Sequence, residues 1–116
     1  MDFSPGSIIT FSYNGTKVND KKPIVVVLGQ HKDKLHAINI NYLNVLQERR
    51  LRQAFAYSFL TRVLKTENPA KTIASDPIKF YNNYVKKFMR ILKSNVYRTY
   101  KINDISNVKI KESIIE

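Results

Sequence analysis

Six basic residues between Val85 and Ile102 are the first candidates for chemistry in this sequence, because no acidic residue lies among them. Lysine and arginine on one helix face, without compensating acids, are typical of contacts to phosphate groups. A second basic group occupies the first turns of an expected helix, where cations oppose the helix dipole and so favour a partner over helix stability. A solvated surface is the alternative interpretation of both groups. The two groups are Lys86, Lys87, Arg90, Lys93, Arg98 and Lys101, and Arg49, Arg50 and Arg52.

Tyr97 and Tyr100 lie beside the last two bases of the first group, which makes them candidates for stacking on unpaired nucleotides. Such stacking contributes about 1–3 kcal/mol per base where it occurs. Packing of both rings in the core, with Arg98 paired to an acid, is the alternative. The predicted nucleic-acid-binding set is therefore Arg49, Arg50, Arg52, Lys86, Lys87, Arg90, Lys93, Tyr97, Arg98, Tyr100 and Lys101.

Other kinds of chemistry find little support among the residues. The chain has no cysteine and two histidines, His31 and His36, which the expected turn between them places on different local surfaces. Zinc would need further carboxylates, and no cluster offers them at ligand spacing. The three glycines each sit at an expected turn, so no phosphate-binding loop is present. We expect no catalytic residues, no metal, no cofactor and no enzymatic activity.

Length and charge indicate one basic domain. The 116 residues carry a net charge of +11, and their size suits a single core over residues 1–116. Residues 43–116 hold fifteen Lys and Arg against six acids, whereas residues 1–42 hold five against three. We therefore expect a β-rich layer at 1–42 and a basic helical layer at 43–116. No apolar run approaches the roughly 18 residues that a membrane span needs, so no membrane partner is expected.

The N-terminal layer must position these groups on strands. Residues 7–13 alternate, with Ile9, Phe11 and Tyr13 on one face. Residues 24–28 are a continuous apolar run, typical of a strand buried on both faces. Residues 35–40 alternate again, and residues 108–110 supply a short C-terminal strand. The predicted fold is α+β: a small SH3-like antiparallel meander or partly closed barrel over about 7–41, then two helices and that strand.

Two helices are expected in the second layer. Asn44 with Gln47 predicts a capping box for a helix over 46–65, and Asp76 followed by Pro77 predicts the start of another. An apolar stripe on the second helix comprises Ile78, Tyr81, Val85, Phe88 and Leu92. The first helix is apolar over a wide arc that includes residues 54–57, and this predicts an interface and a homo-oligomer.

A series of short motifs resembles small proteins of tailed bacteriophages, of the DNA end protector or uncharacterised virion protein type. It covers about two-thirds of the chain and leaves the helical middle unmatched. The motifs, in order, are Pro5-Gly6-x-Ile8-x-x-Phe11-x-Tyr13, Asp20-x-x-Pro23 before Val25–Leu28, Leu35-x-x-x-Asn39-x-Asn41-Tyr42-Leu43, Tyr97-Arg98-x-Tyr100-Lys101 and Ile105-Ser106-Asn107-Val108.

The resemblance implies a role with DNA or with the virus particle, and it transfers no catalytic residue. Together with the charge, it predicts a non-catalytic phage DNA-binding protein, protecting a genome end or associated with packaged DNA, located in the virion or the host cytoplasm. Two alternatives stay open. One is a structural or assembly component of the head, neck or tail whose basic face meets an acidic protein. The other is a small inhibitor of a host enzyme.

Overall fold

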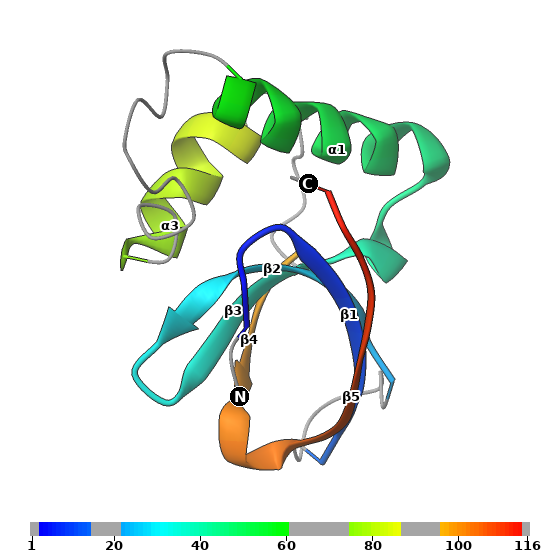
Figure 1. Cartoon of the computed structure of the whole chain (residues 1–116), viewed down its shortest axis with the longest axis vertical. Helices are drawn as coiled ribbons and strands as arrows, with labels where there is room; N and C mark the ends of the chain where they lie inside the picture. The colour runs from blue at the N-terminus through cyan, green and yellow to red at the C-terminus, as the bar shows by residue number, and fades with distance from the viewer. Residues whose placement is uncertain (1–2, 15–21, 61–74, 87–95, 115–116) are drawn as a thin grey trace.

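A five-stranded antiparallel sheet forms the centre of the protein in the computed structural model, which describes residues 3–14, 22–60, 75–86 and 96–114. Its strands cross the sheet in the order β4-β3-β2-β1-β5, so the first strand of the chain pairs with the last. The sheet curls on itself, and the helices lie together over one end of it (Figure 1). The strands are β1 (Ser7–Tyr13), β2 (Ile24–His31), β3 (Lys34–Asn39), β4 (Tyr97–Lys101) and β5 (Ile105–Ser113).

The antiparallel meander predicted from the first 42 residues is confirmed as β1, β2 and β3. The predicted C-terminal strand is also present, but it is longer than expected and β4 precedes it. The 3₁₀ turn η4 (Ile102–Asp104) joins β4 to β5. Apart from the predicted strand at 108–110, the assignment of 43–116 to a helical layer was therefore wrong for residues 97–113. Polar and basic residues dominate β4 because it is an edge strand with one exposed side, which hid its alternation.

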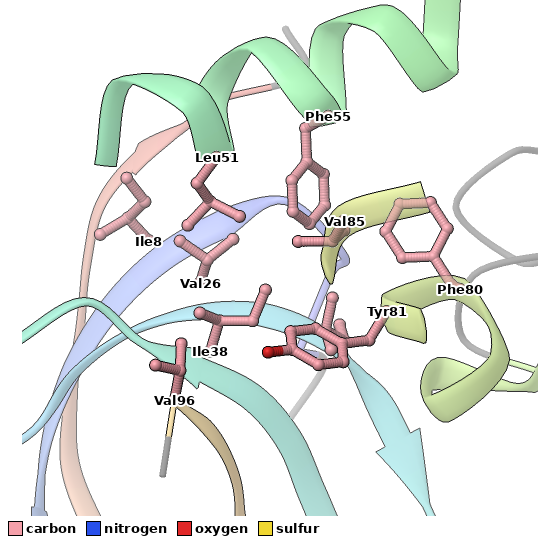
Figure 2. Packing of buried hydrophobic residues seen from close by; sticks show 10 residues of the cluster. Ile8, Val26, Ile38, Leu51, Phe55, Phe80, Tyr81, Val85 and Val96 are labelled. Carbon is pink, nitrogen blue, oxygen red and sulfur yellow. The ribbon is translucent and has the colours of Figure 1, made fainter. Parts of the chain in front are cut away.

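Strand β2 is buried on both faces, as its apolar run predicted. Val25 and Val27 point into the curled sheet, where they pack with the β1 residues Ile9 and Phe11. Val26 and Leu28 point the other way, toward the helices. Figure 2 shows Val26 with side chains from the helices and neighbouring strands converging on it. The sheet thus separates two apolar cores.

Helix α1 (Val45–Leu60) follows the short turn η1 (Ile40–Tyr42). It covers the core that contains Val26 and Leu28, which we call the outer core. The predicted capping box is confirmed: the Gln47 N–H donates to Asn44 Oδ1 at 2.8 Å, and the Asn44 N–H donates to Gln47 Oε1 at 3.0 Å. Ala54 and Phe55 are buried against the sheet, so these two do not serve the predicted interface. The expected end of the helix at Lys65 lies outside the described residues.

The second helical segment begins as predicted and then widens. Asp76 caps α3 (Pro77–Phe80), because its carboxylate accepts from the Lys79 N–H at 3.1 Å. The chain continues as the π-helical η3 (Tyr81–Lys86). The expected stripe was wrong at Ile78, which is 53% exposed. Phe80 is buried instead, since the wider π turn brings Phe80 and Val85, five residues apart, to one face. Phe88 and Leu92 lie outside the described residues.

Replacement of Phe55 tests the outer core. Its ring lies 5.4 Å from that of Phe80, centroid to centroid, and its side chain has no exposed surface. We expect Phe55→Ala to lower the free energy of unfolding by about 3–5 kcal/mol, because it removes buried apolar area and leaves a cavity. Urea unfolding followed by circular dichroism measures this.

The control is Val45→Ala on the same helix, because Val45 is 76% exposed. That variant should change the free energy of unfolding by less than about 0.5 kcal/mol. Similar stabilities for the two variants would contradict this description of α1.

Candidate nucleic-acid interface

Exposed cations gather where β3 meets β4. Lys34 and Lys101 are directly opposed in the register of the two strands, so their side chains leave the same face of the sheet. Like charges in such a position repel, which disfavours the pairing unless an anion lies between them. Lys32, in the adjoining turn, has a positive φ of 57°. We call the set Lys32, Lys34, Arg98 and Lys101 the cationic edge. Within this set Arg98 is half-exposed, and strand alternation places it on the opposite face of β4 from Lys101.

The cationic edge includes one acid in its turn, Asp33, whose exposed side chain forms no ion pair within the described part of the chain. The backbone carbonyl of Asp33 accepts from the Ile102 N–H at 2.9 Å. This bond holds the end of β4 against the β2–β3 turn. The lysines at 34 and 101 are therefore kept together by the backbone.

Arg98 lies over an aromatic ring. Its guanidinium carbon is 5.9 Å from the centre of the Tyr42 ring, and Tyr42 is 39% exposed. The predicted alternative, an ion pair between Arg98 and an acid, is absent among the described residues. Tyr42 was missed as a site candidate, and its place in the Asn41-Tyr42-Leu43 motif was its only sequence signal. An exposed ring under a guanidinium is a surface on which a base can stack.

The base-stacking prediction is wrong for Tyr100. This side chain is 2% exposed and meets the rings of Phe11 and Tyr13 edge-on, with centroid distances of 5.2 and 5.0 Å. Its hydroxyl accepts from Asn39 Nδ2 at 3.1 Å. Tyr100 alternates inward on β4 opposite Leu35, so it packs inside the curled sheet, where its ring is buried.

Tyr97 is half-buried and belongs to a small cluster with both histidines. Its hydroxyl lies 2.6 Å from His36 Nδ1, and the His31 and His36 rings are 6.2 Å apart. The prediction that the histidines occupy different surfaces was therefore wrong. His31 and His36 belong to the β2–β3 hairpin, and the paired register brings residues five apart along the chain side by side.

The cluster has defined protonation. Burial raises the pKa of Tyr97, with the Asp76 carboxylate and Tyr81 adding to the effect, so the hydroxyl keeps its proton and donates to Nδ1. Burial lowers the pKa of His36, and the nearby His31 and Lys34 lower it further. The His36 imidazole is therefore neutral, and its Nδ1 accepts from Tyr97 in the tautomer that carries the proton on Nε2. The Tyr81 ring, 5.0 Å from Tyr97, continues the contact to η3, so this cluster joins the sheet to the helices.

The basic residues of the first helix divide into two kinds. Arg49 is exposed and Arg50 is half-exposed. Arg52 instead bridges Glu48, at 3.4 Å, and Glu112 on β5. The hydrogen bond to Glu112 is the main cause of the raised pKa of Arg52. Arg52 is therefore engaged in holding α1 to β5, and this counts against its predicted contact with nucleic acid. Lys86 is exposed on η3, while Lys87, Arg90 and Lys93 lie outside the described residues.

The described residues carry more positive than negative charge. Within the described ranges there are twelve Lys and Arg and five acids, and Arg52 alone among those cations forms an ion pair. Asp76 is engaged at its helix cap, and Glu48 and Glu112 are engaged by Arg52. The exposed cations therefore have few internal partners, and their field extends into solvent.

The described residues hold neither a metal-binding cluster nor a helix that could span a membrane. No group of three or more His, Asp or Glu side chains there lies close enough to hold a metal ion. No helix in these ranges has the length and apolar composition that crossing a membrane needs.

Fold and site together define a small basic α+β protein with a curled antiparallel sheet and an exposed cationic edge. No family model, no curated protein and no solved structure matches the chain. The likeness to phage proteins therefore stays a prediction.

The lowered pKa of His36 predicts a pH-dependent stability. Above the pKa of about 6.5 in the unfolded chain, both states hold a neutral imidazole; below it, the unfolded chain binds the proton more readily. The free energy of unfolding should therefore fall as the pH drops from about 7.5 to about 5.5. Urea titrations at a series of pH values measure it.

His36→Asn should flatten this dependence, because its amide oxygen can accept from Tyr97 and does not titrate. His31→Asn, a matched change at an exposed position, should keep most of the slope. A slope in His36→Asn equal to that of the unaltered protein would show that other groups cause it.

Proposed function

We propose that this protein binds DNA through its phosphate groups, without catalysis and with little sequence preference. The observation that carries the proposal is the direct opposition of Lys34 and Lys101, two exposed lysines that form no ion pair with any described residue. A phosphate near both ammonium groups would turn a repulsive pair into two attractive contacts. Single phosphates recur along DNA, so the same contact can form at any sequence.

The rest of the cationic edge supports the same partner. Arg98 over Tyr42 offers a guanidinium beside an exposed ring, a combination used for contacts to phosphate and to unpaired bases. Lys32 extends the charge into the hairpin turn. Arg49, Arg50 and Lys86 are exposed or half-exposed, so they remain available as additional phosphate contacts.

We also propose that the curled sheet is an SH3-like, partly closed barrel. A meander whose first strand pairs with its last, with a 3₁₀ turn between the final two strands, supports an SH3-like, partly closed barrel. Such a fold does not by itself specify a ligand. It accounts for the exposed cations, because a barrel that small has its interior filled by side chains and can bind only on its surface.

The biological setting that we propose rests on the phage-like motifs: a protein that guards a genome end or accompanies packaged DNA in the virion. The second candidate is a component of the particle that binds other proteins. It is favoured by the exposed apolar side chains of Val45 and Leu46 beside Arg49 at the start of α1. Cross-linking in assembled particles distinguishes the two, because an assembly component should cross-link through α1 to protein.

Charge removal at the cationic edge tests DNA binding. Fluorescence anisotropy with a short duplex, at several salt concentrations, should give an affinity that falls steeply with salt, with a log–log slope near −0.9 per phosphate contacted. Lys34→Ala combined with Lys101→Ala should weaken binding at least about tenfold and make the slope shallower by roughly two contacts.

Lys79→Ala combined with Lys111→Ala is the matched control, because both residues are exposed lysines outside the cationic edge. It should change the affinity by less than about threefold. Equal losses in the two double variants, or no measurable binding at low salt, would refute the assignment of the cationic edge as the DNA contact.

A further inference from the structure

A surface hollow of about 340 Å³ lies over β1. In the sheet, β2 separates β1 from β3 and β4, where the cationic edge lies. Ligand pockets begin at about this size, near 300 Å³. Among the described residues that line the hollow none is acidic, and five of these six carry a hydrogen-bond donor on the side chain. They are Thr10, Phe11, Ser12, Lys22, Asn107 and Lys109.

Strand register explains how the hollow is built. Ile9 and Phe11 pack inside the barrel, so the alternating residues Thr10 and Ser12 direct their hydroxyls outward. Lys109 of β5 is paired with Thr10, and its side chain leaves the same face. On the other side, Thr10 is paired with Ile24, where β2 begins, and Lys22, two residues before that strand, lines the hollow together with Ser12. The lining therefore combines two lysines with two hydroxyl-bearing residues.

A β-bulge completes the hollow. Thr10 pairs with Lys109 and Ser12 with Ser106, so two residues of β5, Asn107 and Val108, oppose one residue of β1. Asn107 adopts a positive φ of 55°, a conformation that few residues other than glycine take and that asparagine tolerates. Bulges redirect side chains and occur often beside binding sites. Asn107 is one of the two bulge residues, and it lines the hollow.

The donor set matches one class of ligand. Two lysines supply positive charge that no described lining residue neutralises, and two hydroxyls and an amide supply neutral hydrogen-bond donors. This charge repels a cation and favours an anion over a neutral ligand. We propose that the hollow binds the phosphate of a small phosphate ester, with Lys22 and Lys109 holding the charge and Thr10, Ser12 and Asn107 donating to its oxygens. This goes beyond DNA binding, because none of these residues belongs to the cationic edge.

Titration of the ¹⁵N-labelled protein tests the site, with inorganic phosphate and then adenosine monophosphate as probes at constant ionic strength. Amide signals of Thr10, Ser12 and Asn107 should shift and saturate. Lys22→Ala and Lys109→Ala should each weaken binding at least about tenfold, since each removes a charge-assisted contact. Lys111→Ala, an exposed lysine on the same strand that does not line the hollow, should weaken it less than about twofold.

Asn107→Gly separates ligand contact from backbone shape. Glycine accepts the positive φ of the bulge, so the variant should keep its melting temperature and the spectrum of its core while phosphate binds several-fold more weakly. Unchanged phosphate affinity in Asn107→Gly would overturn the assigned contact. Equal losses in Lys109→Ala and Lys111→Ala, or shifts reproduced by chloride alone, would overturn the site itself.

A competition experiment then identifies the source of the phosphate. If a duplex displaces adenosine monophosphate and Lys109→Ala weakens both, the hollow takes a phosphate of DNA; if the duplex does not displace it, the hollow serves a small ester. Displacement by the duplex would overturn the assignment to a small ester and would leave a phosphate site for DNA. The double variant at Lys34 and Lys101 should retain phosphate binding at the hollow, so failure of the DNA proposal and failure of this one are distinguishable.

Discussion

Burial of β2 on both faces is the constraint on which the rest of the structure depends. A strand that alternates Val25 and Val27 with Val26 and Leu28 needs an apolar partner on each side. One partner is the curled sheet itself, closed by the pairing of β1 with β5. The other is the pair of helical segments, which Figure 1 shows over one end of the sheet. Each fully buried side chain contributes about 1.5–3 kcal/mol, so neither core is dispensable.

This arrangement decides where charge can lie. Both faces of the central strand are occupied, so the described cations lie on the edge strands β4 and β5, in or beside the turns that flank β2 and β3, and on the helical segments. Strand pairing then brings some of them together against their own repulsion, as at Lys34 and Lys101. Backbone hydrogen bonds and core packing hold these lysines in place, and a phosphate partner would relieve the repulsion. Surface potentials of one sign also speed the approach of a polyanion.

Prediction from the sequence succeeded where short-range physics decides the structure. The Asn44–Gln47 capping box, the Asp76 cap and the two-faced burial of residues 24–28 each follow from residues within a few positions of one another. It failed where a neighbour came from elsewhere. Arg52 was predicted to contact nucleic acid, yet it bonds to Glu48 on its own helix and to Glu112, sixty residues away. Ile78 was expected in the core because ordinary helical periodicity places it there, and the π turn of η3 shifts the buried face to Phe80.

The sequence by itself determined the strand and helix types, the basic character of the surface and much of the apolar core, because alternation, capping and charge are local properties. Tertiary structure alone decided which residues meet across the sheet. Tyr97 reaches His36, Tyr100 reaches Asn39, and Lys109 stands beside Thr10 over a bulge. Those meetings depend on strand register between segments sixty or more residues apart, and a shift of one residue would send each side chain to the opposite face. Local pattern leaves that register open, and the packing of both cores selects it.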